Sequence, residues 1–159
     1  ANEFAQGQGH PLLALVGPPG QGKTHLAIAI AWEWLERDRG GVVWGTVDQH
    51  LEDLKACFDR SLKDDWRSGP TFTVRWDWLR TCPLLILDDL GMEHHTAWGE
   101  SKLDALIDWR WLNSLRTVVT TNAAPAELSK RIVDRLADTE RSTWLTLKGP
   151  SHRLGKELA

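Results

Sequence analysis

Residues 17–24 read Gly-Pro-Pro-Gly-Gln-Gly-Lys-Thr, and this stretch decides the fold. It fits the pattern G-x-x-x-x-G-K-[ST] at every defined position, with an apolar run at 12–16 before it and a helical pattern after it. Glycines let such a loop approach a polyphosphate, and the freed N–H groups and the helix N-terminus attract phosphate oxygens. The stretch therefore predicts a phosphate-binding loop between a strand and a helix.

The chemistry of the loop also predicts which residues bind a nucleotide. Lys23 is expected to reach the β- and γ-phosphates, and the Thr24 hydroxyl is expected to hold Mg²⁺. The nucleotide-binding positions run through the loop into the first helical turn: Gly17, Pro18, Pro19, Gly20, Gln21, Gly22, Lys23, Thr24 and His25.

Composition places the chain among globular, single-domain proteins. It has 159 residues, 42% of them hydrophobic and 26% charged, and a net charge of -3. That charge argues against a strongly basic nucleic-acid binder, although a local basic patch remains compatible with it. No apolar run approaches the length of a membrane span, and no signal peptide is recognisable, so we expect a cytoplasmic protein with no membrane partner. Cys57 and Cys82 fit no metal pattern and are expected to be free, buried thiols.

Strand and helix patterns alternate along the chain, which predicts a mostly parallel five-stranded sheet with helices on both faces. Asp48 is expected to cap the helix that carries Leu51, Leu54 and Phe58 toward the core, and residues 72–79 are compatible with either a helix or a strand. The expected units are a lead-in at 1–11, an α/β core at 12–150 and a tail at 151–159. Strands are expected at 12–16, 42–47, 84–87, 117–121 and 143–147, and helices at 24–37, from 48, at 99–112 and from 125.

Polar residues follow two of the predicted strands. Asp88 and Asp89 come directly after the apolar run 84–87, and Asn122 ends the run 117–121. Ligands of parallel sheets bind at the carboxyl ends of the strands, where the phosphate loop also lies. Asp88 is expected to help hold Mg²⁺, and Asp89 to orient or deprotonate an attacking water.

Taken together, these segments resemble the AAA+ ATPases of the DnaC/IstB type, which are bacterial and phage helicase loaders and transposition helpers. The resemblance extends from about Leu12 to Arg153. In that family the middle segment usually reads Tyr-Arg-Tyr where this chain has Trp-Arg-Trp at 109–111. The segments that carry it are residues 17–27, 46–54, 84–91, 107–111, 118–122, 131–136 and 149–153.

The resemblance implies a role for each matching position and names ATP as the nucleotide. Lys23 and Thr24 match Walker A, Asp88 the metal-binding acid and Asp89 the catalytic acid, where many AAA+ proteins have Glu. Asn122 matches sensor 1, which reads the γ-phosphate. Arg135 matches the arginine finger that is offered to a neighbouring subunit in an ATP-bound homo-oligomer. Arg131 is the alternative finger, and Arg153 is either a sensor-2-like or a structural residue. The family's N-terminal partner-binding region and its helical lid are not expected here.

Three functions are compatible with these residues. The first is a helicase-loader ATPase that binds single-stranded DNA and a replicative helicase. The second is a transposition helper that acts on duplex DNA with a transposase. The third is a scaffold that binds ATP and hardly hydrolyses it. Tryptophans and basic residues lie together between 55 and 80, and a surface for single-stranded DNA competes there with buried rings and solvated charges. They are Lys55, Arg60, Lys63, Arg67, Arg75, Arg80, Trp66, Trp76 and Trp78.

Overall fold

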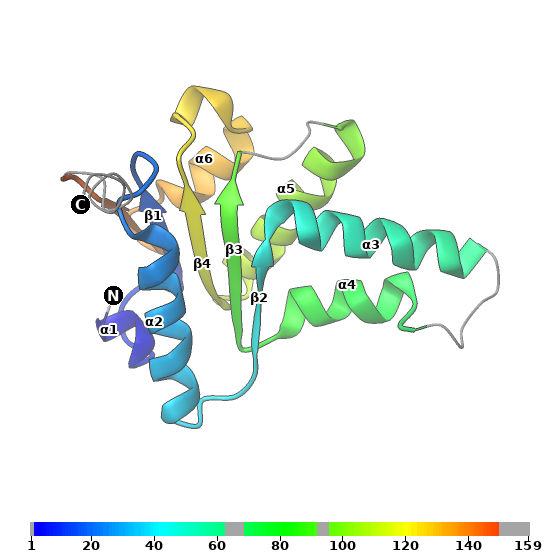
Figure 1. The fold of residues 1–159 in the computed structure, drawn as a ribbon, viewed down its shortest axis with the longest axis horizontal. Helices are drawn as coiled ribbons and strands as arrows, with labels where there is room; N and C mark the ends of the chain where they lie inside the picture. The colour runs from blue at the N-terminus through cyan, green and yellow to red at the C-terminus, as the bar shows by residue number, and fades with distance from the viewer. Residues whose placement is uncertain (1, 63–68, 92–95, 150–159) are drawn as a thin grey trace, which may run out of the picture.

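The computed structural model describes residues 2–62, 69–91 and 96–149, which form one sheet flanked by helices (Figure 1). The five strands are ordered β2-β3-β4-β1-β5, and every recorded pairing between them is parallel. The predicted five-stranded parallel sheet is therefore confirmed. Its strands are β1 (Leu12–Val16), β2 (Val42–Thr46), β3 (Leu84–Leu90), β4 (Arg116–Thr121) and β5 (Ser142–Thr146).

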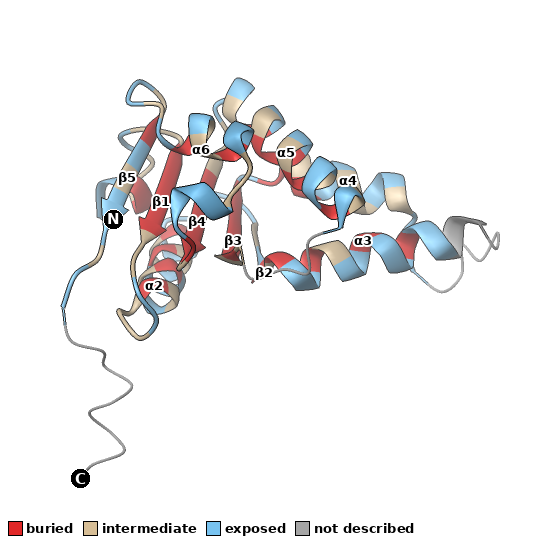
Figure 2. Cartoon of the chain, turned by 90° about the horizontal axis from the view of Figure 1, so that it is seen from above, coloured by how far each residue is buried: buried red, intermediate tan, exposed pale blue. Residues whose placement is uncertain are grey.

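The inner strands are apolar on both sides because each face of the sheet is covered. Alternate residues of β1 enter different core clusters, with Leu13 and Leu15 on one face and Leu12 and Ala14 on the other. The helices α1 (Asn2–Ala5) and α2 (Lys23–Glu36) cover the first face. The helices α4 (Phe72–Thr81), α5 (Ala97–Leu112) and α6 (Lys130–Leu136) cover the second, as the view from above shows (Figure 2).

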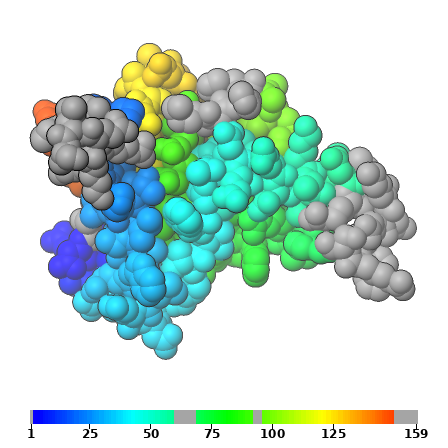
Figure 3. All heavy atoms as spheres, viewed as in Figure 1, coloured from blue at the N-terminus to red at the C-terminus, as the bar shows by residue number. Residues whose placement is uncertain are grey.

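The helix α3 (Val47–Leu62) follows β2 directly and projects beyond the sheet beside α4. In the space-filling view, α2 in blue and α3 in cyan to teal form much of the visible face (Figure 3). No helix of the described segments is both long enough and apolar enough to cross a membrane. Cys57 and Cys82 are free and buried, as expected.

Residues 2–5 differ from the expected lead-in because they form the short helix α1. Phe4 and Ala5 of this helix are buried against α2. Arg116 fixes the connection that follows, since its guanidinium donates to the carbonyl oxygens of Gly7, Gln8 and His10. These contacts join segments more than a hundred residues apart, which explains why the local sequence gives little sign of them.

Several helix boundaries also differ from the sequence-based expectation. For residues 72–79, where the sequence was compatible with a helix or a strand, the structure has a helix with Thr71 as the N-cap. Asp48 is not the cap of α3, because that helix begins at Val47 and the Thr46 hydroxyl accepts from the backbone N–H of Gln49. The single helix expected from 125 is divided into a 3-10 turn at Pro125–Glu127 and α6, which Ser129 caps.

Phe58 does not face the core as expected. Its side chain is 46% exposed, whereas Leu54 on the same helix is buried. Phe58 instead packs on the Phe72 ring in a T-shaped arrangement, with 6.0 Å between the ring centroids. It therefore joins α3 to α4 where the two helices project beyond the sheet.

Candidate functional site

The phosphate loop leaves the carboxyl end of β1 and enters α2. A Cβ at Gly17 would lie 2.6 Å from the carbonyl oxygen of Leu147, so only glycine fits beside the segment after β5. Gly22 has φ 82° and is the N-cap of α2, where no side chain caps the helix. The first N–H groups of α2 are therefore open to an anion, which the helix dipole also favours.

Lys23 is buried inside the loop, with 5% of its surface exposed. Its Nζ donates to the carbonyl oxygens of Gly17 at 2.8 Å and Pro18 at 2.9 Å. A buried ammonium group needs such acceptors because desolvation is unfavourable for a charge. Phosphate oxygens would be stronger acceptors than these neutral carbonyls, so the lysine is poised for an anionic ligand.

Asp88 connects the phosphate loop to the middle of the sheet. It is 4% exposed, and its Oδ1 accepts from the Thr24 hydroxyl at 3.0 Å and from the Thr120 hydroxyl at 2.6 Å. Within the described residues Oδ2 accepts no recorded hydrogen bond. The Thr24 oxygen also keeps its lone pairs, because the hydroxyl acts as the donor to Asp88. A carboxylate and a hydroxyl oxygen at one point suit Mg²⁺, which takes few protein ligands and keeps several waters.

Asp89 has an unusual backbone conformation that separates it from Asp88. The register between β3 and β4 shifts between Leu87 and Leu90, and Asp89 has φ 55°. Its N–H donates to the Thr120 hydroxyl at 2.9 Å. A positive φ is uncommon outside glycine, and Asp is among the residues that tolerate it best. The irregularity lies beside the predicted active site, where β-bulges are over-represented.

Asn122 directly follows β4, which pairs with the strand that carries the two acids. Its side-chain oxygen is buried and has no hydrogen-bond partner. A buried polar atom without a partner is rare in native proteins and points to a missing ligand or water. The carboxyl ends of β1, β3 and β4 thus bring together Lys23, Thr24, Asp88, Asp89 and Asn122 at one edge of the sheet.

Arg135 lies apart from this group, on α6. Its Nε donates to Asp108 Oδ1 on α5 at 2.6 Å, and its Cζ lies 4.2 Å from the ring centroid of Trp111. Arg131 approaches the same carboxylate less closely, at 3.5 Å, and its side chain is 60% exposed. Neither arginine has a recorded bond to the phosphate loop in the described part of the chain. Arg153 lies outside the described residues.

Two contacts at the site could not be predicted from the sequence. Thr120 bridges Asp88 and the Asp89 backbone, and it could be recognised only once the register of β3 against β4 was known. Gln21 donates to the carbonyl oxygen of Gly149 at 2.5 Å, which ties the loop to the segment after β5. The only sequence signal for Thr120 is its position in the predicted strand 117–121, two residues before Asn122.

Arg110 is a second buried cation, and it is distant from the phosphate loop in its contacts. It is 0% exposed, and burial lowers the pKa of its guanidinium. Its donors reach the carbonyl oxygens of Leu79 and Arg80 at the end of α4, together with those of Cys82 and Arg116. The central residue of the Trp-Arg-Trp segment therefore has a structural role.

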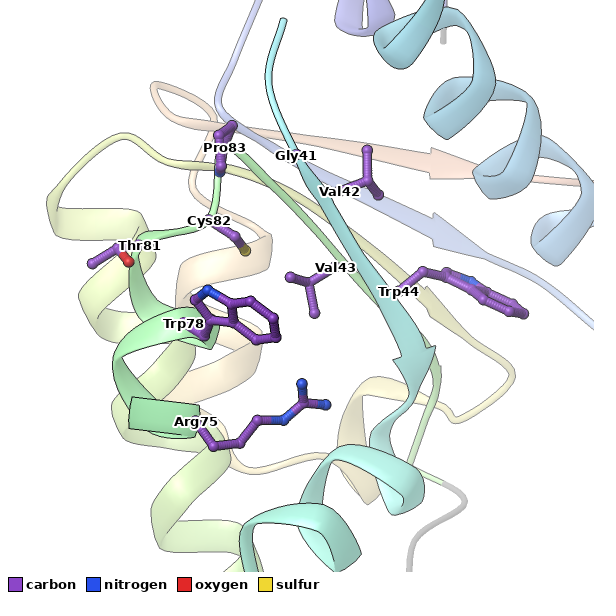
Figure 4. A pocket seen from close by; sticks show the side chains of 9 residues that line it. All are labelled: Gly41, Val42, Val43, Trp44, Arg75, Trp78, Thr81, Cys82 and Pro83. Atoms are coloured by element: carbon purple, nitrogen blue, oxygen red, sulfur yellow. The ribbon is translucent and has the colours of Figure 1, made fainter. Parts of the chain in front are cut away.

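A pocket of about 510 Å³ lies beside β2, at the opposite end of the sheet from the phosphate loop. Its walls come from the start of β2 and from α4, and Figure 4 shows Arg75 and Trp78 beside Val43. The Trp78 side chain is 60% exposed. Arg75 pairs with Asp53 at 2.8 Å, and its Nε has no recorded partner. This surface is separate from the nucleotide site.

The basic and aromatic residues predicted between 55 and 80 have different surroundings. Trp76 stacks on Phe72 and packs against the core, so its ring is partly buried. Arg80 lies over the Trp109 ring at 3.6 Å. Trp78 is exposed, and so is Lys55. Lys63, Trp66 and Arg67 lie outside the described residues, and so does the side chain of Arg60.

The fold and the site define a P-loop nucleotide-binding protein. The chain belongs to the IstB-like ATP binding protein family, which matches residues 8–158. It is 28% identical over 148 residues to the replicative helicase loader DnaC of Escherichia coli (strain K12), covering 89% of this chain and 57% of that protein. It is 33% identical over 150 residues to a putative ATP-binding protein in an insertion sequence of Mycobacterium tuberculosis, covering 87% and 54%. The chain thus spans little more than half of these relatives.

The same relationship is visible in three dimensions. A crystal structure of the DnaC helicase loader matches this fold with a TM-score of 0.65 and 25% sequence identity. The match covers 93% of this chain and 81% of that one. The AAA+ fold and the DnaC/IstB resemblance expected from the sequence are both confirmed, and ATP is the nucleotide that the family binds.

Proposed function

We propose that this chain hydrolyses ATP as the core of a helicase-loader type of replication protein. The observation that supports this most strongly is the bond between Thr24 and Asp88 beside the buried Lys23, with Asn122 next to them. A phosphate loop alone would bind a nucleotide. The added acid and amide at neighbouring strand ends are the groups that phosphoryl transfer to water requires.

In the proposed reaction each residue stabilises or positions one group. Lys23 exchanges its two loop carbonyls for oxygens of the β- and γ-phosphates. Thr24 and Asp88 would hold Mg²⁺, and the ion would supply positive charge next to the phosphates. Asp89 orients the attacking water, and the free Asn122 oxygen accepts a hydrogen bond from that water beside the γ-phosphate. Such catalysis depends on position and charge rather than on a covalent intermediate.

The proposed reaction also needs a cation at the γ-phosphate besides Lys23. No arginine of the described residues is bonded near the phosphate loop, and Arg135 is held on α6. We propose that Arg135 completes the site of a neighbouring subunit in an ATP-bound homo-oligomer. Arginine fingers supplied in this way raise turnover by about 10³–10⁵. Hydrolysis by an isolated chain should therefore be slow.

Single-stranded DNA and a replicative helicase are the proposed partners. The relationship to DnaC supports this assignment, and the exposed Trp78 beside Arg75 offers a ring on which a base can stack. Trp78→Ala should weaken binding of a single-stranded oligonucleotide by about 1–3 kcal/mol. Trp32→Ala is the matched control, because Trp32 on α2 is similarly exposed at 64%. Equal losses in the two variants would contradict a specific role for Trp78, as would no loss in either.

The insertion-sequence relative supports a second candidate, a transposition helper that acts on duplex DNA with a transposase. ATP turnover measured without DNA, with single-stranded DNA and with duplex DNA separates the candidates. A helicase-loader type should respond to single strands, whereas a transposition helper should respond to duplex. ATP binding with no turnover in all three conditions would indicate a nucleotide-gated scaffold. Lys23→Ala should be inactive throughout.

A further inference from the structure

The Arg135 side chain is seated between α6 and α5 by two residues of α5. Asp108 and Trp111 are three residues apart, so they lie on the same face of the helix. Asp108 binds Arg135 Nε at 2.6 Å, and the guanidinium lies over the Trp111 ring at 4.2 Å. Only 31% of the Arg135 side chain is exposed, although the residue lies on a short surface helix.

The atoms of Arg135 are used unequally in this arrangement. The ion pair occupies Nε, while Nη1 and Nη2 have no recorded hydrogen bond within the described residues. The two terminal nitrogens form the fork that recognises phosphate oxygens. Arg131 differs, because its contact with Asp108 is only 3.5 Å and most of its side chain is exposed. Of the two arginines, only Arg135 has a short ion pair at Nε and leaves Nη1 and Nη2 available for a ligand.

Trp111 is itself held in place by further contacts. Its indole Nε1 donates to Asp138 at 3.0 Å, and Arg141 packs against its ring at 4.7 Å. The Arg135 backbone is also fixed, because its carbonyl oxygen accepts from the Ser142 hydroxyl at 2.6 Å. The surface under the guanidinium is therefore built by contacts that reach the beginning of β5.

We propose that Asp108 and Trp111 are positioning residues that orient Arg135 for the ATP site of the next subunit. This inference rests on the proposed finger role of Arg135. An unrestrained arginine would lose much rotational freedom on reaching a phosphate, and an anchored one has already lost it. These contacts orient the side chain without inhibiting it, because an inhibitory contact would also occupy the two terminal nitrogens. Loss of either residue should therefore slow hydrolysis rather than accelerate it.

The test measures ATP turnover at protein concentrations where the wild type assembles. Asp108→Asn and Trp111→Leu should each lower the turnover rate by about tenfold to a hundredfold, the value of a charge-assisted contact. ATP affinity should stay unchanged. Trp111→Phe keeps a ring and should stay within a few-fold of wild type. Asp104→Asn is the matched control, because Asp104 also joins α5 to α6, by accepting from Ser129 at 2.5 Å, without touching Arg135.

Mixed assemblies distinguish positioning from a purely structural role. The Asp89→Asn variant keeps Arg135, Asp108 and Trp111, but its own ATP site is defective. Mixing it with Asp108→Asn should restore turnover above the sum of the separate variants, because the intact finger then serves the intact site. No recovery would overturn the proposal, and so would a faster Asp108→Asn enzyme. If Arg135→Ala itself turned over like wild type, or if Arg131→Ala were the slow variant, the finger assignment would fail instead.

Discussion

Lys23 and Arg110 are both buried cations, but they differ in the number and kind of their hydrogen-bond partners. Lys23 is 5% exposed in a glycine-rich loop, where its recorded hydrogen bonds go to two loop carbonyls. Arg110 is fully buried and makes six recorded hydrogen bonds to α4, β4 and the residues before β3. The first set of partners can be exchanged for phosphate oxygens. The second set joins elements that must stay together.

The comparison shows how equal burial can serve two different purposes. Arg110 binds carbonyls at the C-terminal end of α4, where the helix dipole favours a cation. Its planar guanidinium donates to four backbone carbonyls, the Thr117 hydroxyl and the Cys82 sulfur. Lys23 lies instead where the N-terminus of α2 favours an anion. We infer that Arg110 stabilises the fold and that Lys23 is held ready for a ligand.

Replacing Arg110 should give the largest effect on stability. Arg110→Leu leaves several buried carbonyls without a donor, each at about 1–3 kcal/mol. We expect the free energy of unfolding to fall by about 3–5 kcal/mol, measured by chemical denaturation. Arg110→Lys should recover only part of it, because an ammonium group cannot reproduce the planar fork. A Leu variant as stable as the wild type would show that the network contributes little.

Replacing Lys23 should lower ATP affinity and leave stability almost unchanged. Lys23→Ala should weaken ATP binding by at least about 100-fold, because charge-assisted hydrogen bonds to the phosphates are lost. Its thermal stability should stay near that of the wild type, since the loss of two hydrogen bonds to loop carbonyls is offset by the removal of a buried charge. Calorimetric titration with Mg·ATP measures the first quantity and thermal unfolding the second. Unchanged affinity would contradict the assigned role of the loop.

Thr120 lies between these two extremes, because it serves both the site and the sheet. Thr120→Val keeps the shape but removes the donor to Asp88 and the acceptor for the Asp89 N–H. We expect a stability loss of about 1–2 kcal/mol. The Mg²⁺ concentration needed for half-maximal turnover should also rise. Thr121→Val is the control, because Thr121 is equally buried but donates to the Leu90 carbonyl instead.

His50 should give the smallest effect. It is 3% exposed, and burial lowers the pKa of its imidazole below the ordinary value of 6.5. Below about pH 6.5 the unfolded chain binds a proton that the native histidine does not yet bind. The free energy of unfolding should therefore decrease as the pH falls, by at most about 1.4 kcal/mol per unit. His50→Leu should flatten this part of the pH profile, and an unchanged slope would assign it to other groups.

The sequence predicted the features that depend on neighbouring residues. The phosphate loop, the apolar strand that leads to Asp88 and the parallel sheet could all be inferred, because each has a local pattern of glycine, acidic or apolar residues. The expected end of that strand at residue 87 is wrong, because β3 continues to Leu90 and includes both acids. The short helix α1 could not be inferred, because Arg116 of a distant strand packs on Phe4 and binds the residues that follow the helix. The first residues of α3 and α6 were not predicted correctly, because hydroxyl groups that the sequence did not single out cap these helices. They belong to Thr46 and Ser129.

The site was predicted less completely than the fold for the same physical reason. Thr120 reaches Asp88 only because β3 and β4 pair in one particular register. The contacts that orient Arg135 depend on how α5 packs on α6. That packing cannot be predicted from either segment alone. The surroundings of Trp76 and Trp78 differ although they are two residues apart, because only one side of α4 faces the core.

The most direct test is the ATP turnover rate per chain, measured as the protein concentration is raised. If the site is completed by Arg135 of a neighbouring subunit, the rate per chain should be low in dilute solution and rise steeply as assemblies form. Arg135→Ala should stay at the dilute rate at every concentration. A wild-type rate per chain that does not change with concentration would contradict completion of the site by a second subunit.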